Sequence, residues 1–186
     1  MLSPEQVERK IAAVFGKPWK HLKDKETAML YGGVDYKEVT ERATDPSGAM
    51  GAIQRIMSND VACKNVAADF ARPASDRRLF PEIEPDVLPG TSPEADQRIR
   101  AEIVHLHRLV LGRYEAKESD PEVARTYALF DGILSDAHER KGIEPLENYS
   151  CRSDNGESRS KDPDYTLRAW RGVVTYLLRQ EEFLYE

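Results

Sequence analysis

Apolar residues recur along this chain at the spacing of one face of an α-helix. The segment that follows Pro93 carries such a stripe at Ile99, Ile103, Leu106 and Val110. The segments after Pro121 and Pro163 repeat it, the first with Val123, Tyr127, Phe130, Leu134 and Ala137, the second with Leu167, Trp170, Val174 and Leu177. Amphipathic helices must hide such stripes against one another. The pattern therefore predicts an all-α fold, an irregular helical bundle.

Helix starts are marked by a small polar residue followed by proline. Proline suits the first helical position because its missing N–H is one that the helix leaves unbonded there. The polar side chain before it accepts an amide of the first turn, and Ser3 with Gln6 predicts a full capping box. The five predicted starts are Ser3-Pro4, Asp45-Pro46, Ser92-Pro93, Asp120-Pro121 and Asp162-Pro163.

The segment over residues 46–72 is apolar on two opposite faces. One face holds Met50, Ile53, Met57 and Val61, and the other holds Cys63, Val66, Ala67 and Phe70. Either one helix is buried on both sides, or the helix breaks at residues 58–60. We favour a central helix that can kink there. Shorter helices are predicted over 25–31, ended by Gly32-Gly33, and over 36–42, which brings the total to about five to seven.

Two stretches have the composition of irregular structure. Residues 73–91 contain four prolines and predict an extended, Pro-rich connector. Residues 146–162 are rich in serine, asparagine and glycine and predict a polar loop. Neither stretch separates regions of different composition, so we expect a single helical domain over residues 1–186.

The charge balance narrows the classes of partner. The chain has 33 acidic and 27 basic side chains among 186 residues, a net charge of −6. Nucleic acids and anionic membrane surfaces select a basic excess, so neither is an expected partner. No stretch approaches the roughly 20 apolar residues of a membrane-spanning helix. The sequence as written begins without a signal-peptide pattern, which predicts the cytoplasm. If the chain is a fragment of a longer exported protein, the expectation becomes the periplasm or cell envelope.

Motifs for metal, cofactor or nucleophilic chemistry are missing. His105 and His107 are two residues apart, so on a helix they point about 200° from each other and cannot hold one ion. We place His105 on the polar face and His107 at the edge of the apolar stripe. Trp170 is a candidate pocket residue, although a core anchor is the more common role of tryptophan. These three are weak site candidates, and no cofactor or metal is expected.

The two cysteines leave two readings open. Cys63 lies on an apolar helix face and Cys151 in the polar loop. Two free thiols would agree with the missing export signal. A Cys63–Cys151 disulfide would close a loop of about 90 residues, would contribute ~4–5 kcal/mol in the chain-entropy model and would require an oxidising compartment. A Cα–Cα separation beyond ~7 Å would exclude the bond.

Several short strings, taken in order, carry a family resemblance. They span residues 30–35, 39–42, 45–46, 57–63, 78–81, 105–113, 164–170 and 183–186. Together they resemble uncharacterised proteins of planctomycete and myxobacterial type, often the C-terminal region of large envelope proteins with a planctomycete-type cytochrome c domain. The resemblance implies association with an envelope redox or polymer-handling system. The matching strings are of packing type and carry over no active-site residue, and this chain has no haem-attachment motif.

Three functions remain in view. The leading hypothesis is a non-catalytic helical interaction domain that binds a protein partner or another domain of a larger system. The alternative is an accessory subunit or enzyme of an envelope redox or polymer-handling system, with a site built from scattered histidines and carboxylates. The third is a small-ligand sensor with Trp170 and tyrosines in its pocket. A deep cleft with converging titratable groups would favour an enzyme, and a broad exposed apolar patch would favour an interaction domain.

Overall fold

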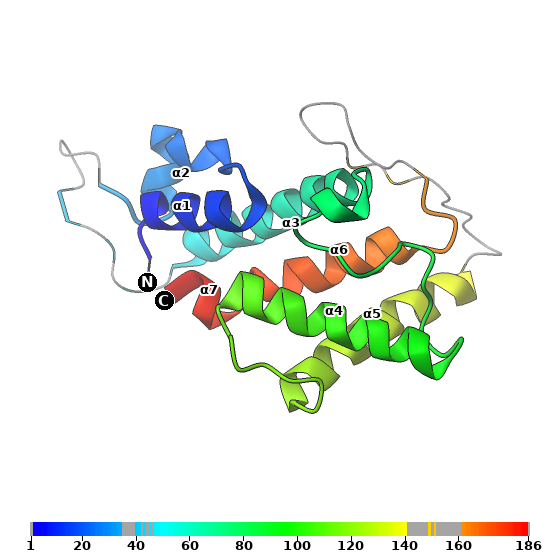
Figure 1. Ribbon diagram of the computed structural model, residues 1–186. Coiled ribbons are helices and arrows are strands. Elements are labelled where there is room, and N and C mark those ends of the chain that lie inside the picture. Colours follow the sequence, from blue (N-terminus) through cyan, green and yellow to red (C-terminus); the bar gives the residue numbers. More distant parts are fainter. Residues whose placement is uncertain are drawn as a thin grey trace.

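The computed structural model describes residues 2–34, 40, 41, 43, 45, 47–140, 149, 151 and 161–185, and this part of the chain is all-α, as predicted (Figure 1). Its helices are α1 (Pro4–Phe15), α2 (Lys25–Leu30), α3 (Gly48–Phe70), α4 (Pro93–Leu111), α5 (Pro121–Arg140), α6 (Thr166–Leu177) and α7 (Glu181–Tyr185). Short 3₁₀ helices span Lys20–Lys23 and Ala74–Asp76.

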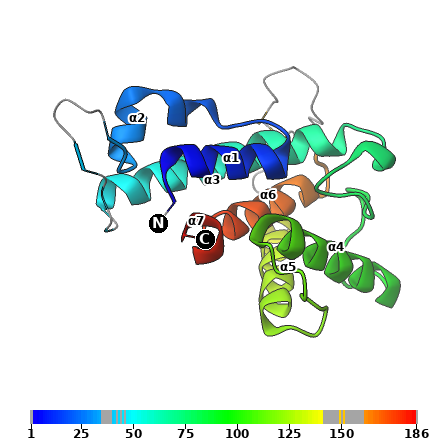
Figure 2. The ribbon, with the colours of Figure 1, turned by 60° about the vertical axis from the view of Figure 1, so that its left-hand side comes forward.

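Helix α6 lies at the centre of the bundle. It packs against α3 on one side and against α5 on the other, and α4 contacts α5, α6 and α7 (Figures 1 and 2). The Trp170 side chain on α6 has no exposed surface, and its ring centroid lies 4.3 Å from that of Phe130 and 5.2 Å from that of Phe80. Aromatic rings therefore join α6 to α5 and to the connector that follows α3.

The neighbours of helix α3 explain why it is apolar on two faces. One face meets α6, while the other side meets the segment around Trp19, whose indole Nε1–H donates to Asp60 at 2.9 Å. The helix runs without a break through residues 58–60 to Phe70. Of the two readings of this segment, one helix buried on both sides is correct.

Two of the predicted helix starts have the expected caps. The Ser3 hydroxyl accepts the Gln6 amide and the Gln6 side chain accepts the Ser3 amide, which completes the capping box of α1. The Ser92 hydroxyl accepts the Ala95 amide at the start of α4. Both caps use partners three residues away, so local sequence was enough to predict them.

Two other starts are displaced. Helix α3 begins at Gly48, where the Ser47 hydroxyl accepts the Met50 amide, so the start predicted at residues 45–46 is two residues early; residue 46 itself lies outside the described part of the chain. Helix α6 begins at Thr166 rather than at residue 163, because Tyr165 takes a left-handed conformation with φ 61°. A turn therefore separates Pro163 from the helix.

Helix α5 starts at the predicted residue, but Asp120 does not cap it as predicted. The helix begins at Pro121, but the Asp120 carboxylate accepts the Lys117 amide at 2.9 Å and so closes the turn before the helix. Residues 40 and 41, the described part of the predicted helix over 36–42, are not helical. The rest of that predicted helix and most of the polar loop over 146–162 lie outside the described residues. Within that loop, Tyr149 is buried.

The Pro-rich connector is irregular, as predicted, but it is part of the core. Leu79, Phe80 and Ile83 are each 2% exposed or less. The Asp69 carboxylate at the end of α3 accepts three consecutive connector amides, those of residues 78, 79 and 80. The Thr166 hydroxyl donates to the Pro85 carbonyl. Residues 73–91 are thus an irregular connector whose apolar side chains are packed into the core.

The two ends of the described chain lie side by side (Figures 1 and 2). The Leu2 amide donates to the Leu184 carbonyl at 3.1 Å, and the Lys10 ammonium donates to the Glu182 carbonyl. Phe183 is fully buried. The apolar tail is docked on the bundle, since its side chains bury surface that water would otherwise meet. None of the described helices has the length and apolar character that crossing a membrane demands.

Candidate functional site

The largest of the described hollows lies where α4 turns into α5. It is open to solvent, has a volume of about 600 Å³, and is lined by residues 107, 112–116 and 120–123. Gly112 ends α4 with φ 71°, a left-handed conformation that glycine adopts without strain. The Arg108 guanidinium then donates to the Ala116 carbonyl at 2.7 Å and holds the turn. The volume is within the range of known ligand pockets, roughly 300–1,000 Å³.

His107 forms part of the pocket wall, and its hydrogen bonds define its tautomer. Its Nε2 lies 2.9 Å from the Thr126 hydroxyl oxygen. That hydroxyl has one proton, which it donates to the Glu122 carbonyl at 2.8 Å. The imidazole must therefore donate from Nε2, which leaves a lone pair on Nδ1. Within the described part of the chain, Nδ1 has no hydrogen-bond partner, although His107 is only 2% exposed.

The electrostatic surroundings keep this imidazole neutral. Burial lowers the pKa of His107, and the positive charge of Arg113 lowers it further, while the carboxylates of residues 120, 122 and 182 oppose both effects. Arg113 is itself paired with Glu182 on α7, and that hydrogen bond lowers the pKa of Glu182. A neutral imidazole with an open lone pair can accept a hydrogen bond from a ligand.

The rim of the pocket combines an aromatic ring with carboxylates. Tyr114 is 79% exposed, and Glu115 beside it is also exposed. Asp120, just before α5, and Glu122, in its first turn, also line the pocket. Deeper in the wall, Ala116 and Val123 are buried and apolar. The pocket therefore has an apolar interior and an acidic rim.

The structure separates the two candidate histidines. His105 contacts the connector, with its Nε2 3.0 Å from the Arg78 carbonyl oxygen, whereas His107 faces Thr126 on α5. His107, predicted at the edge of the apolar stripe, is buried because α5 covers that edge. Among the residues that the structure describes, no cluster of three or more His, Cys, Asp or Glu could hold a metal ion.

Trp170 is a core residue. It has no exposed surface and packs between two phenylalanine rings. Trp170 lines none of the described pockets, and a role as an aromatic anchor explains its position in the stripe of α6.

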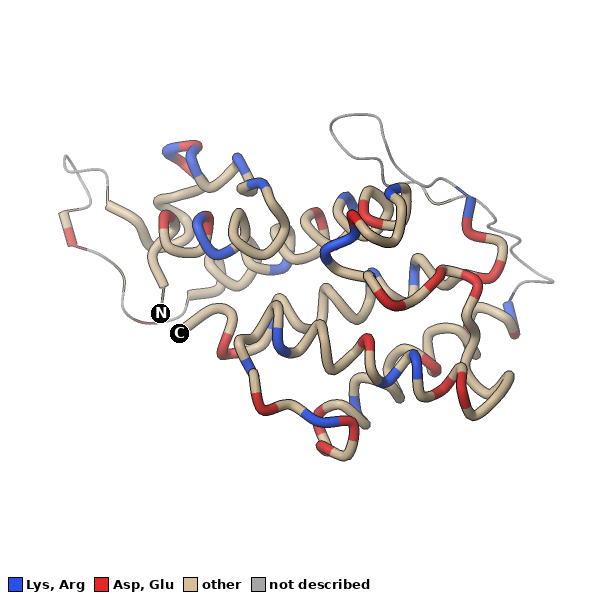
Figure 3. Tube along the Cα trace, in the orientation of Figure 1, with Lys and Arg blue, Asp and Glu red and all other residues tan. Residues whose placement is uncertain are grey.

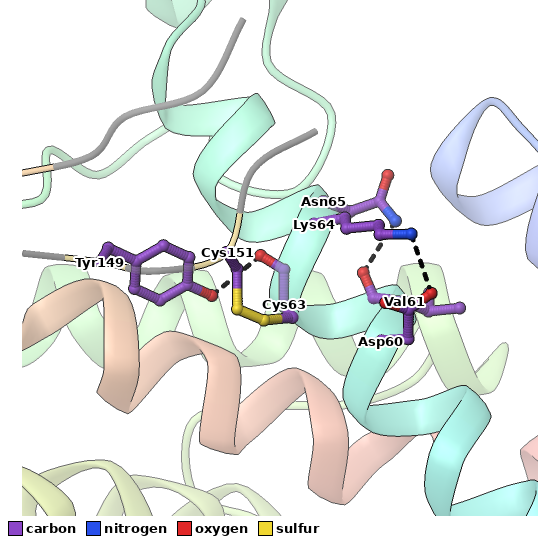
Figure 4. The surroundings of a disulfide bond; sticks show 7 residues. All are labelled: Asp60, Val61, Cys63, Lys64, Asn65, Tyr149 and Cys151. Carbon is purple, nitrogen blue, oxygen red and sulfur yellow. Dashed lines mark hydrogen bonds and ion pairs between the residues drawn. A yellow bond between two sulfur atoms is a disulfide. The ribbon is translucent and has the colours of Figure 1, made fainter. Parts of the chain in front are cut away.

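The two cysteines are joined in the structure. Their Cα atoms are 5.4 Å apart, inside the range that a disulfide spans, and the Sγ atoms are bonded (Figure 4). Beside them the Tyr149 hydroxyl donates to the Cys63 carbonyl at 2.9 Å (Figure 4). Two contacts thus attach residues 149 and 151 to α3.

A smaller hollow lies between the first 3₁₀ helix and α3. It has a volume of about 250 Å³ and is lined by Trp19 and several surface lysines, including Lys17, Lys20 and Lys64. The only carboxylate in its lining, Asp60, already accepts the Trp19 indole and pairs with Lys64. No buried polar group in its lining lacks a partner among the described residues, in contrast to the pocket at His107.

Large exposed apolar side chains do not form a broad patch. Within the described chain they are Leu30, Ile56 and Tyr114, which lie on α2, on α3 and in the turn after α4. Only Tyr114 adjoins the large pocket. Sequence reasoning missed Tyr114, Glu122 and Thr126. The short turn between Gly112 and Asp120-Pro121 was the available signal, because loops between rigid helices commonly carry binding residues.

Comparison with protein-family models, with curated proteins and with solved structures finds no match to this chain.

Proposed function

We propose that this chain is a non-catalytic interaction domain that binds a protein partner, or another domain of a larger envelope system, through the pocket between α4 and α5. The observation that carries the proposal is Tyr114, a 79% exposed aromatic side chain at the rim of an open pocket of about 600 Å³. Tyrosine is enriched among the residues that dominate binding energy at protein interfaces, because its ring buries a large area and its hydroxyl tolerates water.

The shape of the site favours recognition of an anchor side chain over a flat interface. The exposed apolar residues of the described chain are scattered, so the broad apolar patch expected of an interaction domain is not found there. The pocket is open to solvent, unlike the deep cleft expected of an enzyme. An open pocket with an apolar interior instead accepts one side chain of a partner, while the polar rim contacts the residues around it.

The disulfide supports an oxidising compartment. Cytosolic proteins rarely retain structural disulfides, because glutathione and thioredoxin reduce them. The Cys63–Cys151 pair therefore favours the cell envelope over the cytoplasm, in agreement with the resemblance to envelope proteins. The larger envelope system that we propose for this domain would carry out redox reactions or handle polymers.

Site-specific photo-crosslinking tests this function. A benzophenone amino acid at position 114 is expected to crosslink one defined protein, or a defined domain of the same polypeptide, in the cells that make the protein. The matched control carries the same group at position 56, where Ile56 is 54% exposed on α3, away from the pocket. Equal crosslinking at both positions, or none at position 114, contradicts the proposal.

A substitution adds a quantitative test. Tyr114→Ala is expected to weaken the complex by about 30-fold, the factor that corresponds to ~2 kcal/mol at an interface hot spot. Because the side chain is exposed, the free energy of unfolding should change by less than about 0.5 kcal/mol. An unchanged affinity would remove the pocket from the interface.

A further inference from the structure

One buried acceptor in the pocket wall has no hydrogen-bond partner among the described residues. His107 Nδ1 is a buried acceptor with no partner in the described part of the chain, and its tautomer is held by Thr126. Buried acceptors are nearly always paired in folded proteins, since an unpaired one has lost its water without replacement. A ligand that donates one N–H or O–H at this wall would complete the site.

Charge at the pocket selects a cationic donor. The lining contains three carboxylates, those of Glu115, Asp120 and Glu122, against the one guanidinium of Arg113. That guanidinium is already paired with Glu182. Arg108 and Arg125 lie beside the pocket but are not part of its lining, and Arg125 is 64% exposed where it meets Glu122. The whole chain is acidic as well, with a net charge of −6. Opposite charge favours encounter with a basic partner.

The remaining features fit an ammonium on an aliphatic stem. The buried apolar wall at Ala116 and Val123 suits a chain of methylene groups. The exposed ring of Tyr114 at the rim offers a face to a cation. The lone pair on His107 accepts one of the three N–H groups of an ammonium and leaves the other two for the carboxylates, whereas the planar two-pronged donor of a guanidinium prefers to pair with carboxylates alone.

We infer that the pocket between α4 and α5 binds a lysine side chain of the partner protein, whose ammonium donates to His107 Nδ1 and lies among the carboxylates of Glu115, Asp120 and Glu122. This inference rests on the proposed function and names the chemistry of its partner. An arginine side chain, a neutral donor or a purely apolar anchor are the competing occupants.

NMR titration of the intact, oxidised protein tests the inference. The probe is Nα-acetyl-lysine N-methylamide, added to protein with ¹⁵N-labelled histidines. Saturable binding should shift the His107 Nδ1 resonance in the direction of an accepted hydrogen bond, with little change at Nε2. The Nε-acetylated probe and the norleucine counterpart should bind at least about tenfold more weakly. Tighter binding of the arginine counterpart, or equal binding of the norleucine one, would overturn the assignment to lysine.

Charge variants supply the matched comparison. The double substitution Glu115→Gln and Glu122→Gln should weaken binding of the lysine probe several-fold. Glu118→Gln, on an exposed residue of the same turn outside the lining, should leave it unchanged. If Glu118→Gln weakened binding in proportion to its one removed charge, by about half the free energy of the double substitution, only the net charge of the protein would matter, which overturns the inference.

Crosslinking at position 114 and binding of the lysine probe distinguish failure of the proposed function from failure of the lysine inference. Crosslinking at position 114 without binding of the lysine probe retains the interaction domain and overturns the lysine anchor. Because His107→Phe can disturb folding, its unfolding transition is recorded first. If that variant unfolds like the parent protein, unchanged probe affinity contradicts the role of Nδ1. If the variant unfolds differently, the shift of the Nδ1 resonance in the unmodified protein decides whether Nδ1 accepts a hydrogen bond from the probe.

Discussion

The carboxylate of Asp69, in the last turn of α3, accepts the backbone amide of Leu79 at 2.9 Å. The same carboxylate accepts the amides of Arg78 and Phe80, each at 3.0 Å. One side chain thus satisfies three consecutive donors of a segment that has no regular structure to satisfy them. This arrangement places the Phe80 ring against Phe70, with ring centroids 4.3 Å apart, and against Trp170.

Replacing Asp69 should therefore destabilise the fold strongly. Asp69→Asn puts an amide donor opposite backbone donors, so we expect a loss of about 2–4 kcal/mol in the free energy of unfolding, measured by urea denaturation. The matched control is Asp76→Asn, on an exposed residue of the connector, with an expected change below about 0.5 kcal/mol. Similar losses for both substitutions would show that the three amide bonds contribute little.

The disulfide should contribute to stability through the unfolded state. The bond joins residues 88 apart, and constraining a loop of that length contributes up to about 4–5 kcal/mol in the chain-entropy model. Reductant should lower the free energy of unfolding by a comparable amount, read from denaturation curves. The double variant Cys63→Ser and Cys151→Ser should be insensitive to reductant. A parent protein whose stability does not respond to reductant would contradict the prediction.

Glu102 should make stability fall as pH rises. This carboxyl on α4 has no exposed surface, and burial raises its pKa from the usual 4.5 to about 8, partly offset by the hydrogen bond from the Glu82 amide. Between these two values the unfolded chain releases a proton that the folded protein retains, so the unfolded state gains stability as pH increases. The free energy of unfolding should decline between pH 4.5 and 8 and level off above pH 8.

Glu102→Gln removes this titration and can still accept the Glu82 amide. At pH 7 the variant should be more stable than the parent protein by at most about 3 kcal/mol, with a flatter dependence on pH. Unfolding measured from pH 4 to 9 in one buffer series checks both points. A parent and a variant with parallel pH profiles would mean that Glu102 does not titrate in this range.

Asp162 should matter more to stability than Asp120. The Asp162 carboxylate has no exposed surface, accepts the amide of Leu167 at 3.0 Å, and pairs with the Arg168 guanidinium at 3.0 Å. Asp120 accepts one amide in a turn. We expect Asp162→Ala to cost about 2–3 kcal/mol and Asp120→Ala about 0.5–1 kcal/mol. Thermal unfolding of the two variants provides the comparison, and the opposite order would refute the structural reading of both residues.

The sequence by itself determined the helices and several of their ends. The stripe of α4 and the capping box of Ser3 and Gln6 depend on residues three or four positions apart, so the local pattern contains the needed information. The two apolar faces of α3 left open whether one helix is buried on both sides or breaks at residues 58–60. The displaced start of α6 shows the limit, because the left-handed turn at Tyr165 carries no marker in residues such as Asp162 and Pro163.

Only the tertiary structure decided which irregular and polar residues are buried. Asp69 could be recognised as the centre of the connector only with residues 78–80 folded over it, and His107 acquired its tautomer from Thr126 on another helix. The pocket exists because the turn after Gly112 brings α5 back across α4 (Figures 1 and 2). Charged side chains are spread over all the helices, so charge along the chain did not reveal its acidic rim (Figure 3). Hydrophobic periodicity reports which face of a helix is buried, but the partner that covers that face is set by contacts between residues distant in sequence.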